Sequence, residues 1–282
     1  MFPSLSLCCL LTVAAPPVID SKFEQVAPVP PEAGKVVRSP NQMRAVIVIH
    51  GFHLHTSEDA VARAVFREWQ KPGSLLVKEL AKEADVFSYG YSQNASVEDI
   101  VASGGLADGV RRLRKAGYRE VVIVGHSAGA LIARLFVEDN PDAGVAKVVQ
   151  VCPPNGGAEA AKFDAFPKAQ RPFVDSLTPE ARQKSLKARA DKMIPNGVQF
   201  VCVLSNAAGV GDGLVRCDCQ WTADLQQQCV PVTVVKVAHP MAPRVKKGVD
   251  AIAVAVREDQ PRWKPERVRE MKDELFKKPK ER

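Results

Sequence analysis

The chain has 282 residues, of which 46% are hydrophobic and 25% are charged, and its formal net charge is +7. This composition indicates one folded α/β domain of ordinary size with short extensions, and it excludes a disordered chain. Lysines and arginines are scattered among acidic residues without an aromatic and basic cluster, so the charge indicates a solubilising surface and not a nucleic-acid partner.

An apolar run over residues 5–15 opens the chain. It has the length of a signal peptide, ends in small residues that suit cleavage, and is too short to span a bilayer as a helix. No lysine or arginine precedes it, and Pro16 would follow the cut. We therefore expect residues 1–15 to be an atypical signal peptide of an exported or membrane-associated protein. A cytoplasmic protein is the alternative, and nothing else in the sequence supports membrane association.

Residues 16–42 are rich in proline and polar side chains, and we expect a linker or an extended strap on the domain, to which we assign no secondary structure. Residues 43–257 alternate strand-like and helix-like runs. This alternation predicts an α/β domain with a mainly parallel central sheet covered by helices on both faces. The predicted strands lie at residues 44–49, 85–89, 121–124, 147–151, 198–204 and 232–237.

Helix signals lie between these strands, the first over residues 73–83. Ser96 with Asp99 resembles a capping box that opens a helix, which can break at the glycine pair 104–105. Pro243 suits the first position of a last helix of the domain.

Two segments depart from the alternation. Residues 153–196 are too long and too charged for a short connection, and we expect a small inserted cap over the site. Its polar sequence, with few aromatic residues, gives no preference for acyl-chain length. Residues 258–282 are densely charged with mixed sign, which predicts a solvated helix or a frayed tail.

The strongest functional signal is Gly125-His126-Ser127-Ala128-Gly129. Four β-branched apolar residues precede it and a helical run follows, so a strand turns into a helix with Ser127 at the apex. Such a turn strains the serine backbone and leaves no room for bulk two residues to either side, where Gly125 and Gly129 stand. This is the G-x-S-x-G nucleophile elbow in its expected context. A serine in an ordinary glycine turn is the alternative.

A serine nucleophile needs a base, and histidine suits this role because its pKa lies near the working pH. His239 is the one histidine beyond His126, and it follows the last predicted strand directly, at the same sheet edge as Ser127. A surface-loop histidine is the alternative.

The base needs a carboxylate that holds its tautomer. Asp212 follows the preceding strand in the turn Gly211-Asp212-Gly213 and gives the order Ser…Asp…His. Such turns also serve geometry or calcium binding. Asp218 and Asp224 are competitors for the same role.

An oxyanion needs preorganised donors. The Ala128 N–H at the start of a helix and the Phe52 N–H after His50 and Gly51 are the candidates. We expect His50 to order this loop.

No metal or cofactor is expected. His50, His53 and His55 crowd together but lack a completing acid or cysteine pattern. Three cysteines cluster in one loop region, namely Cys217, Cys219 and Cys229. If the protein is exported, one disulfide can form among them; otherwise the three thiols stay unpaired.

Taken in order, residues 49–52, 125–129 and 211–213 and His239 resemble an α/β-hydrolase of the lipase and serine-esterase type over residues 44–257. Residues 153–157 are similar to the Pro-x-x-Gly turn of many such enzymes. The resemblance implies hydrolysis of a carboxylic ester through an acyl-enzyme, with Ser127 as nucleophile, Asp212 as acid and His239 as base.

The resemblance implies a small ester or lipid substrate and no cofactor. It leaves the substrate open, because thioesterases, amidases and acyltransferases share these motifs. A hydrolase-fold protein that only binds its ligand is the alternative from another class, and the oligomeric state is open.

Overall fold

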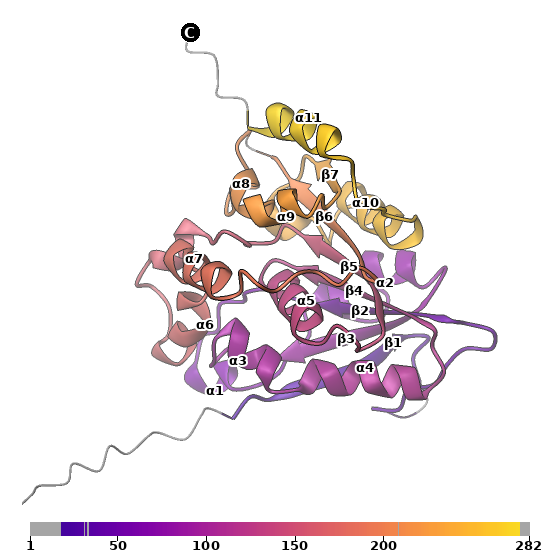
Figure 1. The fold of residues 1–282 in the computed structure, drawn as a ribbon. Helices are drawn as coiled ribbons and strands as arrows, with labels where there is room; N and C mark the ends of the chain where they lie inside the picture. Colours follow the sequence, from indigo (N-terminus) through magenta and orange to yellow (C-terminus); the bar gives the residue numbers. More distant parts are fainter. Residues whose placement is uncertain (1–17, 31, 33, 208, 277–282) are drawn as a thin grey trace, which may run out of the picture.

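A seven-stranded sheet forms the centre of the computed structural model, which describes residues 18–276 except residues 31, 33 and 208. The strand order is β1-β3-β2-β4-β5-β6-β7, and β1 alone is antiparallel to its neighbour (Figure 1). The strands are β1 (Ser21–Ala27), β2 (Arg44–Ile49), β3 (Asp85–Tyr91), β4 (Glu120–His126), β5 (Val145–Val151), β6 (Gln199–Ser205) and β7 (Val232–Val235).

Helices cover both faces of this sheet, as predicted. The α-helices are α1 (Glu58–Val61), α2 (Leu75–Leu80), α3 (Val97–Ala102), α4 (Gly105–Lys115), α5 (Ala128–Asp139), α6 (Arg171–Asp175), α7 (Pro179–Ala188), α8 (Cys217–Gln220), α9 (Ala223–Gln227), α10 (Lys246–Arg257) and α11 (Pro265–Leu275). The 3-10 helices are η1 (Glu68–Gln70), η2 (Glu159–Lys162), η3 (Lys168–Gln170) and η4 (His239–Met241).

The sheet separates two apolar cores. In β2, Ile47 and Ile49 face the core under α3, α4 and α5, whereas Val46 and Val48 face the core under α2 and α10. Because successive strand residues point to opposite faces, a strand buried on both faces is apolar throughout. This is why each predicted strand is confirmed to within two residues at either end.

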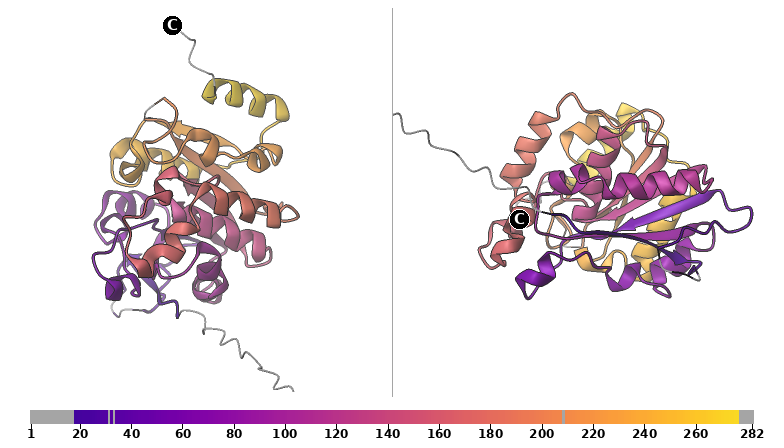
Figure 2. Two further views of the ribbon diagram at one scale, coloured as in Figure 1. Left: turned by 90° about the vertical axis from the view of Figure 1, so that its left-hand side faces the viewer. Right: turned by 90° about the horizontal axis from the view of Figure 1, so that it is seen from below.

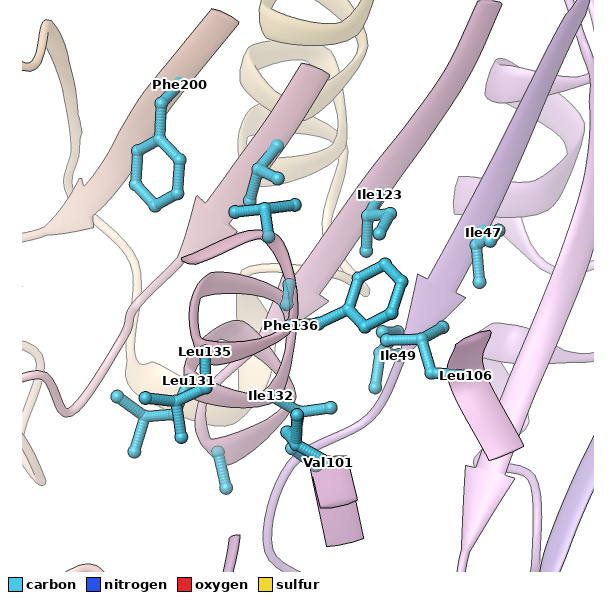
Figure 3. Close-up of a cluster of buried hydrophobic side chains, with 14 of the residues drawn as sticks. Ile47, Ile49, Val101, Leu106, Ile123, Leu131, Ile132, Leu135, Phe136 and Phe200 are labelled. Carbon is cyan, nitrogen blue, oxygen red and sulfur yellow. The ribbon is translucent and has the colours of Figure 1, made fainter. Parts of the chain in front are cut away.

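Helix α5 lies at the centre of the larger core. Figure 3 shows Phe136 from this helix beside Ile123 of β4 and Ile47 of β2, all of them buried. Burying each such side chain contributes roughly 1.5–3 kcal/mol. The helix that follows Ser127 is therefore anchored along its length.

The capping signal at Ser96 is confirmed, since its Oγ accepts from the Asp99 N–H at 3.1 Å and α3 begins at the next residue. The predicted break is present as well. Gly104 has a φ of +81° between α3 and α4, a left-handed conformation that favours glycine.

Residues 16–42, to which the sequence assigned no secondary structure, contain the strand β1. Phe23 of this strand stacks on Phe87 of β3 at 5.4 Å, and the Gln25 side chain exchanges two 2.8 Å hydrogen bonds with the Val37 backbone. Phe87 lies far along the chain, so composition alone gave no sign of the strand.

The prediction that a helix begins at Pro243 is also wrong. Val245 has extended backbone with a ψ of 149°, and α10 begins at Lys246. The short helix η4 and a turn occupy the preceding residues.

The charged C-terminal segment does form a helix, but one side of α11 is packed. Val268 and Met271 are buried, and Trp263 before the helix contacts Trp221 edge-on at 6.3 Å. The prediction of a fully solvated helix therefore holds only for its outer face.

Residues 153–196 contain η2, η3, α6 and α7. The two α-helices lie together at the left-hand side of Figure 1 and of the right view of Figure 2. The signal-like run at residues 1–15 lies outside the described residues. Within residues 18–276, apart from the three gaps, no helix has both the length and the apolar character that crossing a bilayer requires.

Candidate active site

Ser127 stands between the end of β4 and the start of α5 in a strained conformation. Its φ is 56° and its ψ is −128°, backbone angles that residues other than glycine rarely adopt. Its N–H donates to the Val151 carbonyl of the neighbouring strand at 2.8 Å. Tertiary contacts therefore hold the strained turn in place.

Close packing leaves no room for side chains around this turn. A Cβ added to Gly129 would lie 2.8 Å from the carbonyl carbon of Ile49, and one added to Gly125 would lie 2.6 Å from the Ala130 Cα. A Cβ added to Gly51 would lie 2.9 Å from the Ser127 Oγ. The glycines thus let the loop after β2 approach the serine.

His239 and Asp212 lie together although 27 residues separate them, with His239 Nδ1 2.6 Å from Asp212 Oδ2. The Asp212 carboxylate also accepts from the N–H groups of Leu214 at 2.9 Å and Val215 at 2.7 Å. Burial alone would raise the pKa of Asp212, but these hydrogen bonds, led by that of His239, hold its pKa below the ordinary value of 3.8. The carboxylate is therefore ionised at neutral pH.

The two competing carboxylates are engaged elsewhere. Asp218 binds Arg216, with Oδ2 2.8 Å from Nη2. Asp224 pairs with the buried Arg134. Of the three candidates, Asp212 is the one that contacts His239.

The two candidate oxyanion donors lie on either side of Ser127. Ala128 is the first residue of α5, where an amide has no acceptor within the helix. Phe52 follows the His50-Gly51 loop, and its side chain lines the same cavity as Ser127. In the described part of the chain neither N–H donates to another protein group.

A polar network that the sequence does not predict supports this loop from behind. The Tyr91 hydroxyl donates to the His50 carbonyl at 2.7 Å, and the Gln93 amide donates to the Gly51 carbonyl at 3.0 Å. The His50 ring stacks on Tyr91 at 4.5 Å, and burial lowers the pKa of His50 to about 4. Neither Tyr91 nor Gln93 has a sequence signal, because each of them bonds to a loop that lies much earlier in the chain.

His126 also has a role that its position in the motif did not reveal. Its Nε2 lies 2.9 Å from the His239 carbonyl oxygen, so this nitrogen carries the proton and donates it. Burial, followed by the nearby His239, lowers the pKa of His126 to about 3. A neutral ring thus links the elbow to the loop that carries His239.

Potential metal ligands are arranged differently from the sequence pattern. Among the described residues, Cys152, Asp212 and His239 bring three ligand atoms within 4.8 Å, whereas His50, His53 and His55 do not form such a group. Burial, with the Asp212 charge, raises the pKa of the Cys152 thiol well above its usual value. The remaining thiols form no disulfide in the described chain and are those of Cys202, Cys217, Cys219 and Cys229.

A cavity of about 220 Å³ opens over Ser127. Residues of the 153–196 segment form most of its wall, including Ala161, Phe166 and Leu177, and His239 is its one ionisable lining residue. The wall is therefore apolar, although the sequence of the segment is polar overall. The side chains of the segment that line the cavity are apolar, whereas charged ones such as Glu159, Lys162 and Lys168 are exposed.

Comparisons with known proteins find the likeness at the level of structure. No protein-family model matches the sequence, and no curated protein matches it. Bacillus licheniformis lipase BlEst2 in its mature form is 16% identical with a TM-score of 0.58, covering 85% of this chain and 97% of that one.

Two further solved structures are similar. Phospholipase PlaB from Legionella pneumophila is 13% identical with a TM-score of 0.56, covering 83% of this chain and 63% of that one. Aspergillus fumigatus lipase B is 14% identical with a TM-score of 0.53, covering 80% of this chain and 55% of that one. Together with the sheet order, this likeness shows the α/β-hydrolase fold.

Proposed function

We propose that this chain of α/β-hydrolase fold is a serine hydrolase that cleaves a carboxylic ester through an acyl-enzyme and needs no cofactor. One observation carries the proposal: the strained Ser127 lines a cavity together with His239, whose Nδ1 lies 2.6 Å from the Asp212 carboxylate. The solved structures of similar fold named as lipases support ester chemistry.

The hydrogen bond to Asp212 sets the tautomer of the base. Since His239 Nδ1 donates to the carboxylate, Nε2 carries no proton and can accept one from Ser127 Oγ. The Oγ then attacks the ester carbonyl carbon, and Asp212 stabilises the imidazolium that forms.

The tetrahedral intermediate places negative charge on the former carbonyl oxygen. The N–H groups of Phe52 and Ala128 would donate to it, each lowering the barrier by roughly 3 kcal/mol. His239 Nε2 next donates its proton to the leaving alcohol as the C–O bond breaks. Water, activated by the same nitrogen, attacks the acyl-enzyme and releases the acid and free Ser127.

The inserted segment, in this proposal, serves as a cap that holds the acyl chain. Its apolar residues Ala161, Phe166 and Leu177 line the cavity beside Ser127. Hydrocarbon binding there would exclude water and orient the ester carbonyl.

Labelling with a fluorophosphonate probe tests the nucleophile. The wild-type chain should react, Ser127→Ala should not, and Ser57→Ala, at the exposed cap of α1, should react as the wild type does. Labelling that persists in Ser127→Ala would refute the assignment. Absence of labelling and turnover in the wild type would favour a protein that only binds its ligand.

The choice of substrate distinguishes ester hydrolysis from the related thioesterase and acyltransferase activities. Matched esters and thioesters with a series of acyl chains, each with and without an added alcohol acceptor, distinguish an esterase from a thioesterase and an acyltransferase. We expect esters with an unbranched acyl chain short enough for the cavity to give the highest kcat/KM.

A further inference from the structure

A second cavity, of about 140 Å³, also opens at Ser127. It shares a wall with the apolar cavity, formed by Phe52, Ser127, Leu214 and His239. The rest of its wall includes Arg67 directly before η1, Trp69 within η1, and Arg244 after η4. The two cavities therefore extend from the serine toward different elements, one apolar and one cationic.

The two arginines of the second cavity lack a carboxylate partner. Among the residues that the structure describes, neither guanidinium has a carboxylate oxygen within the 4.0 Å of an ion pair, and the adjacent Glu68 is paired with Lys71. Burial and the charge of Arg244 lower the pKa of Arg67. Two like charges therefore line one small cavity, and neither is in an ion pair with another described residue.

The two buried arginines of the described chain are each paired with a carboxylate, whereas Arg67 is half-buried, Arg244 is exposed, and neither is in an ion pair. Arg134 binds Glu138 at 2.7 Å, and Arg182 binds Glu98 at 2.6 Å. Partial burial of the Arg67 guanidinium without a paired carboxylate is costly, and Arg244 adds a second positive charge to the same cavity wall. Two such arginines beside a nucleophile point to an anion supplied by a ligand.

We propose that Arg67 and Arg244 bind an anionic group, a carboxylate or a phosphate, on the alcohol portion of the ester substrate. This inference rests on the proposed esterase function. A guanidinium fork matches the oxygen atoms of either anion. The apolar cavity, whose lining includes no charged side chain apart from His239 when protonated, takes the hydrocarbon acyl chain. The preferred substrate is thus an apolar acyl group on an anionic alcohol.

Matched esters test this assignment. The substrates are butanoate esters of para-hydroxybenzoate, which is anionic, and of para-hydroxybenzamide, its neutral counterpart. Each rate is divided by that ester's own rate with hydroxide, which removes differences in intrinsic reactivity. We expect the wild type to favour the anionic ester and Arg67→Gln and Arg244→Gln each to lower its kcat/KM about tenfold. The neutral ester should be unaffected.

Arg111→Gln is the matched control, since Arg111 is exposed on α4 and pairs with Asp108. Arg67→Lys keeps a positive charge and should retain part of the preference. Raising NaCl from about 0.05 to about 0.5 M should weaken the preference of the wild type and leave that of the double glutamine variant unchanged. The butanoate ester of hydroxyphenyl phosphate, compared with the benzoate, tells which anion is preferred.

Equal hydrolysis of both esters by the wild type, or equal losses for both in the arginine variants, would overturn the inference while leaving the esterase intact. A dependence on these arginines for nitrophenyl hemisuccinate, whose anion lies on the acyl side, would overturn the assignment to the alcohol. Failure to hydrolyse any ester, with no fluorophosphonate labelling, would reject the proposed function and this inference with it.

Discussion

The turn that carries Ser127 and the turn that carries Asp212 hold their side chains by different means. Around Ser127, glycines allow backbone to pack against backbone: a Cβ on Gly129 would lie 2.8 Å from the Ile49 carbonyl carbon. Asp212 is held in place by hydrogen bonds that its carboxylate accepts from Leu214, Val215 and His239. The elbow is fixed by shape and the acid by polar contacts.

This difference has a consequence for robustness. A packed turn tolerates no added volume, but it does not depend on the charge of a neighbour. A hydrogen-bonded carboxylate is less sensitive to small changes in volume, but it depends on its own charge and on each donor. Substitutions at the two turns should therefore fail in different ways.

Asp212→Asn is expected to have the largest effect. The amide has nearly the same shape but carries no charge to stabilise imidazolium. With its oxygen held by the Leu214 and Val215 N–H groups, its NH2 group would face His239 Nδ1 and favour the wrong tautomer, so kcat should fall on the order of 10⁴-fold. Ester hydrolysis and thermal unfolding together measure this. Asp218→Asn is the control, since Asp218 pairs with Arg216. A greater loss in the control would mean that Asp218 is the acid.

Gly129→Ala tests the packed turn. Glycine-to-alanine changes inside helices usually stabilise, by up to about 1 kcal/mol, whereas the clash here should destabilise by about 2–3 kcal/mol. Denaturant unfolding measures the difference. Gly197→Ala is the control, since nothing lies within 4 Å of its added Cβ, and it should change stability little. Equal stabilities for the two variants would contradict packing as the means that fixes the elbow.

His126 connects the two turns and makes stability depend on pH. Its pKa is lowered from 6.5 to about 3 in the folded protein, so below pH 6.5 the unfolded chain binds the extra proton. The free energy of unfolding should therefore fall on acidification, by up to about 1.4 kcal/mol per pH unit for this group. Denaturant unfolding between about pH 7 and about pH 5 measures the slope. His126→Gln should lower the slope of the unfolding free energy against pH by the amount that corresponds to about one bound proton. An unchanged slope would contradict the role of this ring.

Metal removal should have the smallest effect. Cys152, Asp212 and His239 approach within 4.8 Å, but burial keeps Cys152 a thiol at neutral pH, and metals require the thiolate. We expect EDTA to leave ester hydrolysis unchanged and Cys152→Ser to retain most of it. Activity lost to EDTA and restored by zinc would show that a metal, and not hydrogen bonds, organises these residues.

Much of the fold could be predicted because its signals are local. Continuous β-branched runs predicted the strands of the parallel sheet, and Ser96 with Asp99 predicted the start of α3. The strand β1 could not be predicted, since its stability depends on pairing with β3 and on the stacking of Phe23 on Phe87, far along the chain. The start of α10 was wrong, since the extended backbone of Val245 overrides the preference of Pro243 for a first helical position.

The sequence by itself determined the strand, the turn and the helix around Ser127, because glycine spacing and apolar periodicity act within a few residues. Only the tertiary structure decided that Asp212, and not Asp218 or Asp224, contacts His239, because that choice depends on where distant loops meet. The same holds for the unpaired Arg67 and Arg244 beside Ser127. Charge neutralisation is a property of neighbours in space, which a linear pattern does not contain.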